Sequence, residues 1–154
     1  MLRSLVRVLD ENVLCAVSTI DARTRAHVHI CYFAASPHLE LFFLSDPRSR
    51  HAANLRRRSS AAIAVFSSTQ RWGGSDRGAQ LFGHCAPVPP AQQRRARRIY
   101  QRRFPGLATN RVATGLAMYR FVTRRATVLD ELEFGDAVLV ELDAGRAPRR
   151  RGPR

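Results

Sequence analysis

Four polar side chains are grouped around one predicted helix start, and their types are those that bind phosphate. Ser45 ends an apolar run, and Ser49, Arg50 and His51 follow at the beginning of a helical segment. The first turn of a helix presents free backbone N–H groups, to which hydroxyls and a guanidinium add further donors. We therefore expect these four residues to form a phosphate site. The alternative is an ordinary capped helix with an arginine on its surface.

The histidines raise a second possibility, a metal site. His27 and His29 are two residues apart on a predicted strand and so face the same side. With His51 or His84 they could supply imidazole ligands, but no nearby carboxylate completes a convincing ligand set. We expect no metal, and interpret the pair as polar positions on a strand face.

Composition bounds the class of protein. The chain has 154 residues, enough for one domain with a real core, and 45% of them are hydrophobic. No apolar run approaches the roughly 20 residues that a membrane span needs, and the first residues lack the features of a signal peptide. The three cysteines show no C-x-x-C spacing and indicate buried, reduced thiols. We expect a cytoplasmic protein.

All 26 basic residues are arginine, and the net charge is +14. The absence of lysine excludes Schiff-base chemistry and a lysine-dependent nucleotide loop. Six arginines fall within residues 91–104 and five after Asp143, with no acid in either segment. These segments could contact nucleic-acid phosphates, but no aromatic residues interleave them as a base-stacking surface requires. We expect non-specific, salt-sensitive adhesion and no specific nucleic-acid partner.

Hydrophobic periodicity and turn residues predict the elements that must position these groups. Helices are expected over residues 2–11, from Asp46-Pro47 to about 58, and over 91–104, and strands over 13–19, 26–34, 39–45, 61–67, 79–88, 118–129 and 137–142. Asp46 is a suitable cap and Pro47 suits a first helical position.

Six or seven strands, mostly in meander order and with a few short flanking helices, predict a mainly β protein. A small antiparallel barrel is the simplest architecture, although propensity alone does not separate it from a sandwich. Residues 1–143 would form this domain. Residues 144–154 are rich in Arg, Pro and Gly and are expected to be disordered.

The order of these features resembles the pyridoxamine 5′-phosphate oxidase-like FMN-binding split barrels. The similarity extends over roughly Leu2 to Leu142 and is greatest to a small branch with Ser/Thr-Arg-His at the helix start, here Ser49-Arg50-His51. That branch also has a Tyr-x-x-Arg-Phe-Pro motif, here beginning at Tyr100, and a Phe-Gly pair, here at Phe134.

The resemblance implies a six- or seven-stranded split barrel that forms a homodimer, with FMN bound between the subunits. Ser45, Ser49, Arg50 and His51 would hold the phosphate. The strand that contains His29, Ile30 and Tyr32 would run beside the isoalloxazine ring. Gln80 would approach the ring from the same subunit or its partner, and Trp72 would cover it.

The function that the resemblance implies is that of an FMN-dependent oxidoreductase acting on an unknown small molecule. His51 stands where the oxidase has a lysine, and the C-terminal substrate segment of the oxidase has no match, so pyridoxamine phosphate oxidation is not expected. The alternatives are the same fold binding a deazaflavin (coenzyme F420) or haem, or serving as a non-catalytic structural dimer. Nucleic-acid binding through the arginine segments is a weaker alternative.

Overall fold

The computed structural model describes residues 2–109, 113–135, 139–143 and 149–151. The helices are α1 (Leu2–Glu11), α2 (Arg50–Arg57), α3 (Gln93–Arg103) and the single-turn α4 (Glu131–Phe134), with short 3-10 turns η1 (Pro90–Gln92) and η2 (Pro105–Thr109). The strands are β1 (Leu14–Ile20), β2 (Ala26–Ala35), β3 (Glu40–Ser45), β4 (Ser60–Phe66), β5 (Arg77–Pro87), β6 (Ala117–Asp130), β7 (Leu139–Asp143) and β8 (Arg149–Arg151).

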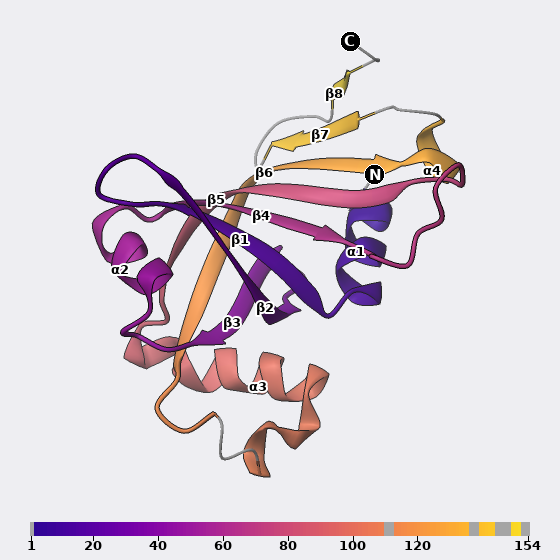
Figure 1. The fold of residues 1–154 in the computed structure, drawn as a ribbon. Coiled ribbons are helices and arrows are strands. Elements are labelled where there is room, and N and C mark those ends of the chain that lie inside the picture. Colours follow the sequence, from indigo (N-terminus) through magenta and orange to yellow (C-terminus); the bar gives the residue numbers. More distant parts are fainter. Residues whose placement is uncertain (1, 110–112, 136–138, 144–148, 152–154) are drawn as a thin grey trace.

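Six antiparallel strands close into a barrel (Figure 1). The pairing order is β3-β2-β1-β4-β5-β6, and β3 also pairs with β6, which joins the two ends. β7 and β8 extend the sheet beyond β6. The closure confirms the expected barrel and rules out the sandwich that propensity had left open.

The strands face two apolar cores. Alternate residues of β1 and β3, such as Val17, Leu41 and Phe43, fill the barrel, and α1 covers one opening with Leu5 and Leu9. A second cluster lies outside the barrel, where α3 packs on β2, β3 and β6. Its buried members are Ala34, Phe42, Val88, Ala96, Tyr100 and Met118.

Gly83 marks a close approach between β5 and β6. The strand register shifts between Phe82 and Gly83, and a Cβ at Gly83 would lie 2.0 Å from the carbonyl oxygen of Val122. Only glycine fits this irregularity, which helps the long strand β6 pair with β5 along both of its halves.

The expected helix start at Asp46-Pro47 is wrong. The helix begins at Arg50 with Ser49 as its N-cap: the Ser49 hydroxyl accepts a hydrogen bond from the backbone N–H of Ala52 at 3.3 Å. Asp46 instead accepts bonds from the backbone and side chain of Arg48 within the preceding turn. Ser49 is as good a cap as Asp46 by residue type, and the turn in which Asp46 binds Arg48 moves the helix start to Arg50.

Two further expectations concern the C-terminal part of the chain. The last predicted strand is observed from Leu139, and its first two expected residues lie outside the described part. Within the segment expected to be disordered, residues 149–151 pair with β7 as β8, and the other positions are not described. Among the described helices, none is long and apolar enough to cross a membrane.

Candidate functional site

An open pocket of about 810 Å³ runs along the edge of β2, between the start of α2 and the end of α3. Ser45 and His51 line it on the α2 side. Ile30 and Tyr32 of β2 line the pocket between its two ends, and most of the remaining wall is apolar. A pocket of this size and character is typical of cofactor and small-molecule sites.

The α2 end of the pocket contains a compact group of neutral polar side chains. The hydroxyls of Ser45 and Ser49 both lie within hydrogen-bond distance of Nε2 of His51, that of Ser49 at 2.9 Å. One ring nitrogen takes part in one hydrogen bond at a time, as donor or acceptor according to its tautomer. One of the two hydroxyls is therefore available for another partner.

A ring contact and the packing of α2 position His51. Its ring stacks on that of His29, with centroids 3.7 Å apart and planes 2° apart, while His27 lies 6.2 Å away. Asn54, one turn further along α2, donates to the hydroxyl of Thr19 on β1 at 3.0 Å. This buried bond fixes α2 against the barrel.

The electrostatics of this group favour neutral imidazoles. Burial, with smaller contributions from His29 and His27, lowers the pKa of His51 to about 4. Burial, followed by the influence of His27, also lowers the pKa of His29. Near neutral pH both rings are uncharged, so an anion here would be met by hydroxyls and by the positive end of α2 rather than by an imidazolium.

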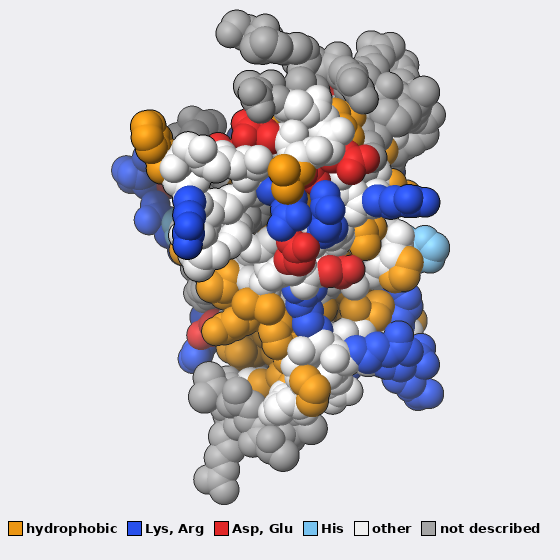
Figure 2. Space-filling view, turned by 90° about the vertical axis from the view of Figure 1, so that its right-hand side faces the viewer, with side chains coloured by type: hydrophobic (Ala, Val, Ile, Leu, Met, Phe, Trp, Pro, Cys, Tyr) orange, Lys and Arg blue, Asp and Glu red, His pale blue; other side chains and the backbone are white. Residues whose placement is uncertain are grey.

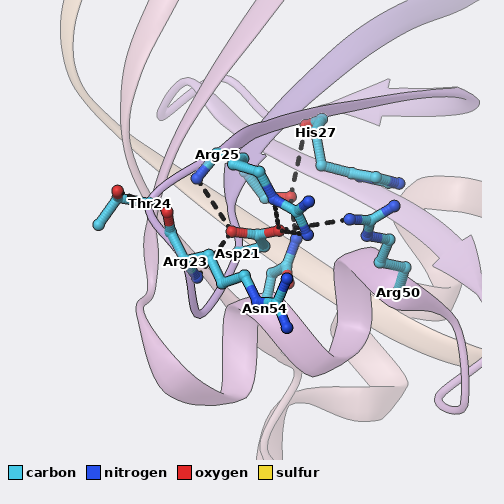
Figure 3. A network of polar contacts seen from close by, with 8 residues as sticks. Asp21, Arg23, Thr24, Arg25, His27, Arg50 and Asn54 are labelled. Carbon is cyan, nitrogen blue, oxygen red and sulfur yellow. Dashed lines mark hydrogen bonds and ion pairs between the residues drawn. The ribbon is translucent and has the colours of Figure 1, made fainter.

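Arg50 points toward a different residue, Asp21 (Figure 3). Its guanidinium lies 3.3 Å from the Asp21 carboxylate at the end of β1. That carboxylate also accepts bonds from the backbone N–H groups of Arg23 and Arg25 and from the Arg25 side chain. Hydrogen bonds from Arg25 and Arg23 hold the pKa of Asp21 well below its usual range, although burial acts in the opposite direction.

The half of β2 beside the pocket has one edge that pairs with no other strand among the described residues. Residues 26–32 pair with β1, whereas β3 pairs only with residues 33–35. The N–H of Phe33 bonds to Val13 on the β1 side, so by strand alternation the backbone groups of Val28, Ile30 and Tyr32 point away from β1. The Tyr32 carbonyl accepts a bond from the hydroxyl of Tyr100 on α3, at 3.5 Å.

The Tyr-x-x-Arg-Phe-Pro motif forms the α3 end of the pocket. Tyr100, Arg103, Phe104 and Pro105 all line it. The ring of Phe104 contacts Tyr32 edge-on at 5.7 Å between centroids. The motif is thus part of the same site as the α2 group, although about fifty residues separate the two in sequence.

The structure brings together some of the predicted site residues and separates others. Ser45, Ser49, His51 and His29 meet, and Ile30 and Tyr32 line the same pocket. Arg50 is turned toward Asp21. Gln80 is exposed on β5 and Trp72 is fully exposed in the loop before it, and neither lines the pocket.

Three contributors were not singled out by sequence reasoning as site residues: Asp21, Tyr100 and Arg103. Nothing in the sequence pairs Asp21 with Arg50, because the two residues are 29 positions apart. The motif that includes Tyr100 and Arg103 was noted without a role, because only the packing of α3 against β2 brings it to the pocket. Among the described residues, no group of three or more His, Cys, Asp or Glu side chains is arranged to hold a metal.

Comparisons with known proteins bear on the fold. No family model matches the chain, and no curated protein matches it. Solved structures do match. A heme binding protein from Mycobacterium smegmatis has a TM-score of 0.75 at 10% identity, over 93% of this chain and 58% of that one.

Two other matches are named as an oxidase and as an FAD-binding protein. A candidate pyridoxamine 5′-phosphate oxidase from Listeria innocua has a TM-score of 0.67 at 11% identity, over 83% of this chain and 97% of that one. An FAD-binding protein from Mesorhizobium loti has a TM-score of 0.65 at 12% identity, over 80% and 89%. This chain has a split-barrel fold. It spans only 55% and 58% of two of the matched chains, the Mycobacterium protein among them.

Proposed function

We propose that this protein binds FMN and acts as a flavin-dependent oxidoreductase on a small molecule. The observation that carries the proposal is the meeting of the Ser45 and Ser49 hydroxyls at His51, beside the first turn of α2 and at one end of a pocket of about 810 Å³. Hydroxyl donors at a helix N-terminus suit a phosphate group.

The residues fit the phosphate of such a cofactor. A phosphate oxygen can accept from the serine hydroxyl that His51 does not engage, and from backbone N–H groups of the first turn. Arg50 would act from the rim: its side chain is 59% exposed and its ion pair with Asp21 is long, at 3.3 Å. Asp46 does not compete for the site, because its carboxylate is bound to Arg48.

The unpaired edge of β2 fits the polar edge of a flavin ring. Backbone groups of Val28 and Ile30 point toward this edge, and groups without a strand partner need another hydrogen-bond partner. A bound flavin would supply the hydride chemistry, and these backbone groups would position its ring.

The same strand supports a homodimer. Val28, Ile30 and Tyr32 are 59%, 71% and 56% exposed, and Leu14, opposite Tyr32 on β1, is 44% exposed. A row of exposed apolar side chains on one sheet face favours burial against a second copy. In that assembly Gln80 and Trp72 of one subunit would be available to the pocket of the other.

Haem is the second candidate ligand. His29 lines the pocket, imidazole is a common axial ligand of haem iron, and the Mycobacterium smegmatis match is a heme binding protein. A deazaflavin would use the same phosphate and ring contacts as FMN.

The absorbance spectrum of the purified protein distinguishes flavin, deazaflavin and haem, and mass spectrometry of the released ligand identifies it. For the phosphate contact, we would compare FMN with riboflavin. Arg50→Ala should weaken FMN binding about tenfold or more and riboflavin binding little, because only FMN has the phosphate. Arg57→Ala, exposed at the other end of α2, is the control. Unchanged FMN affinity in Arg50→Ala would remove Arg50 from the site.

A further inference from the structure

We propose that Arg103 is a recognition residue for the carboxylate of an apolar organic acid bound at the α3 end of the pocket. The inference rests on the proposed function in one respect, which is that the cofactor occupies the α2 end of the pocket. The fold alone does not indicate a substrate, whereas Arg103 indicates an apolar organic acid.

Arg103 is the only residue with a formal charge at neutral pH among the described residues that line the pocket. It is the last residue of α3, and its Nη2 donates to the backbone oxygens of Asp10, at 3.0 Å, and Asn12, at 2.5 Å. These oxygens lie at the C-terminal end of α1, where a cation is favourable.

The remaining donors of the Arg103 guanidinium are unused within the described part of the chain. Nε and Nη1 have no hydrogen-bond partner among the described residues, and neither is buried from solvent. No carboxylate of the described residues lies within ion-pair distance of Arg103. Burial lowers the pKa of this guanidinium, although the charge of Asp10 acts in the opposite direction. A half-buried cation with unused donors favours an anionic partner.

The surroundings of Arg103 define the rest of the ligand. Its guanidinium carbon lies 5.0 Å from the centre of the Phe33 ring. The same pocket is lined by Phe104, Leu107 and Leu116, and the ring of Tyr32 contacts that of Phe104 edge-on. Figure 2, which views the molecule from the side of α1, shows hydrophobic surface beside basic groups in its lower half. An acid with an aromatic or aliphatic body would place that body on this wall and its carboxylate at Arg103.

Two probes of nearly the same shape, one anionic and one neutral, test the proposal: 4-phenylbutyrate and 4-phenylbutanamide. Their dissociation constants are measured by ligand-observed NMR titration of the purified protein at 0.15 M salt. We expect the carboxylate to bind the wild-type protein about tenfold more tightly than the amide, as one charge-assisted contact allows.

Variants assign that preference to one side chain. Arg103→Met should bring the ratio of the two constants close to one while the amide binds as before, and Arg103→Lys should restore part of the preference. Arg102→Met is the matched control, because Arg102 is the exposed neighbour on the same helix. A merely structural role at the end of α1 would weaken both probes together.

Two results would overturn the proposal: no preference for the carboxylate in the wild-type protein, or a preference that survives in Arg103→Met. The first needs no variant and so holds even if Arg103→Met fails to fold. Flavin content is read from the absorbance of the same samples. A preference that follows Arg103 in flavin-free protein would leave this inference standing while the proposed function fails.

Discussion

The imidazole rings of His29 and His51 lie parallel, 3.7 Å apart, although the residues belong to β2 and α2. Two stacked imidazoles cannot both become positively charged imidazolium ions without strong repulsion. Burial is the main cause that lowers the pKa of both rings; His27 lowers that of His29 further, and His29 and His27 lower that of His51, to about 4. The buried stack therefore keeps the α2 end of the pocket neutral near pH 7 and links its charge to pH.

Folding stability should therefore fall as pH drops from about 6.5 to about 4. Below pH 6.5, the usual pKa of histidine, the unfolded chain takes up a proton at position 51 that the folded protein takes up only near pH 4. The unfolded state binds more protons in this window, so the free energy of unfolding rises with pH across it. Urea unfolding at several pH values measures the slope.

Replacing His51 separates its contribution to this pH dependence of stability from the contribution of the carboxylates. In His51→Asn the slope between pH 6.5 and 4 should become shallower, while His38→Asn, in an exposed turn, should leave it unchanged. An identical slope in His51→Asn and the wild-type protein would show that His51 is protonated normally in the fold.

The two serines of the site should differ in their effects on stability. Ser49 is the N-cap of α2, so Ser49→Ala should lower the free energy of unfolding by about 1 kcal/mol. Ser45 caps no helix, so we expect Ser45→Ala to cost less stability. Both should weaken FMN binding, since each removes a hydroxyl from the proposed phosphate site. Urea unfolding and flavin titration measure the two effects, and equal stability losses would contradict the assignment of Ser49 as the cap.

The arginine face of α3 should bind nucleic acid without sequence preference. Arg94, Arg97, Arg98 and Arg102 are exposed, and none forms an ion pair within the described part of the chain. These arginines would contact only phosphates, and such contacts release counterions from the DNA. The affinity for duplex DNA should therefore fall steeply as the salt concentration rises. Replacing the four arginines with glutamine should flatten that dependence, measured by fluorescence anisotropy.

Two unrelated duplexes provide the control for this prediction, and they should bind equally well. A strong preference for one would mean that bases are read, against the expectation of non-specific adhesion. Deleting residues 144–154 measures how much the arginine-rich C-terminal segment contributes to the affinity for DNA.

Local sequence patterns determined most of the elements of this fold. The strand predicted over residues 39–45 is observed as β3, with Leu41 and Phe43 in the barrel and Phe42 under α3. The amphipathic pattern of the first residues predicts α1 over its observed range. These features depend on the spacing of neighbouring residues, which the chain itself specifies. The exact start of α2 did not follow, because Asp46 and Ser49 are both good caps.

Only some of the residues of the site could be predicted from the sequence. Ser45, Ser49 and His51 lie within seven residues, and one turn followed by one helix start brings them together, so sequence could group them. The stack on His29, the pairing of Arg50 with Asp21 and the placement of Arg103 depend on contacts between elements far apart in the chain. Closure of the barrel through β3 and β6, and packing of α3 outside it, decided those contacts, because only folding in three dimensions brings distant segments within reach of one another.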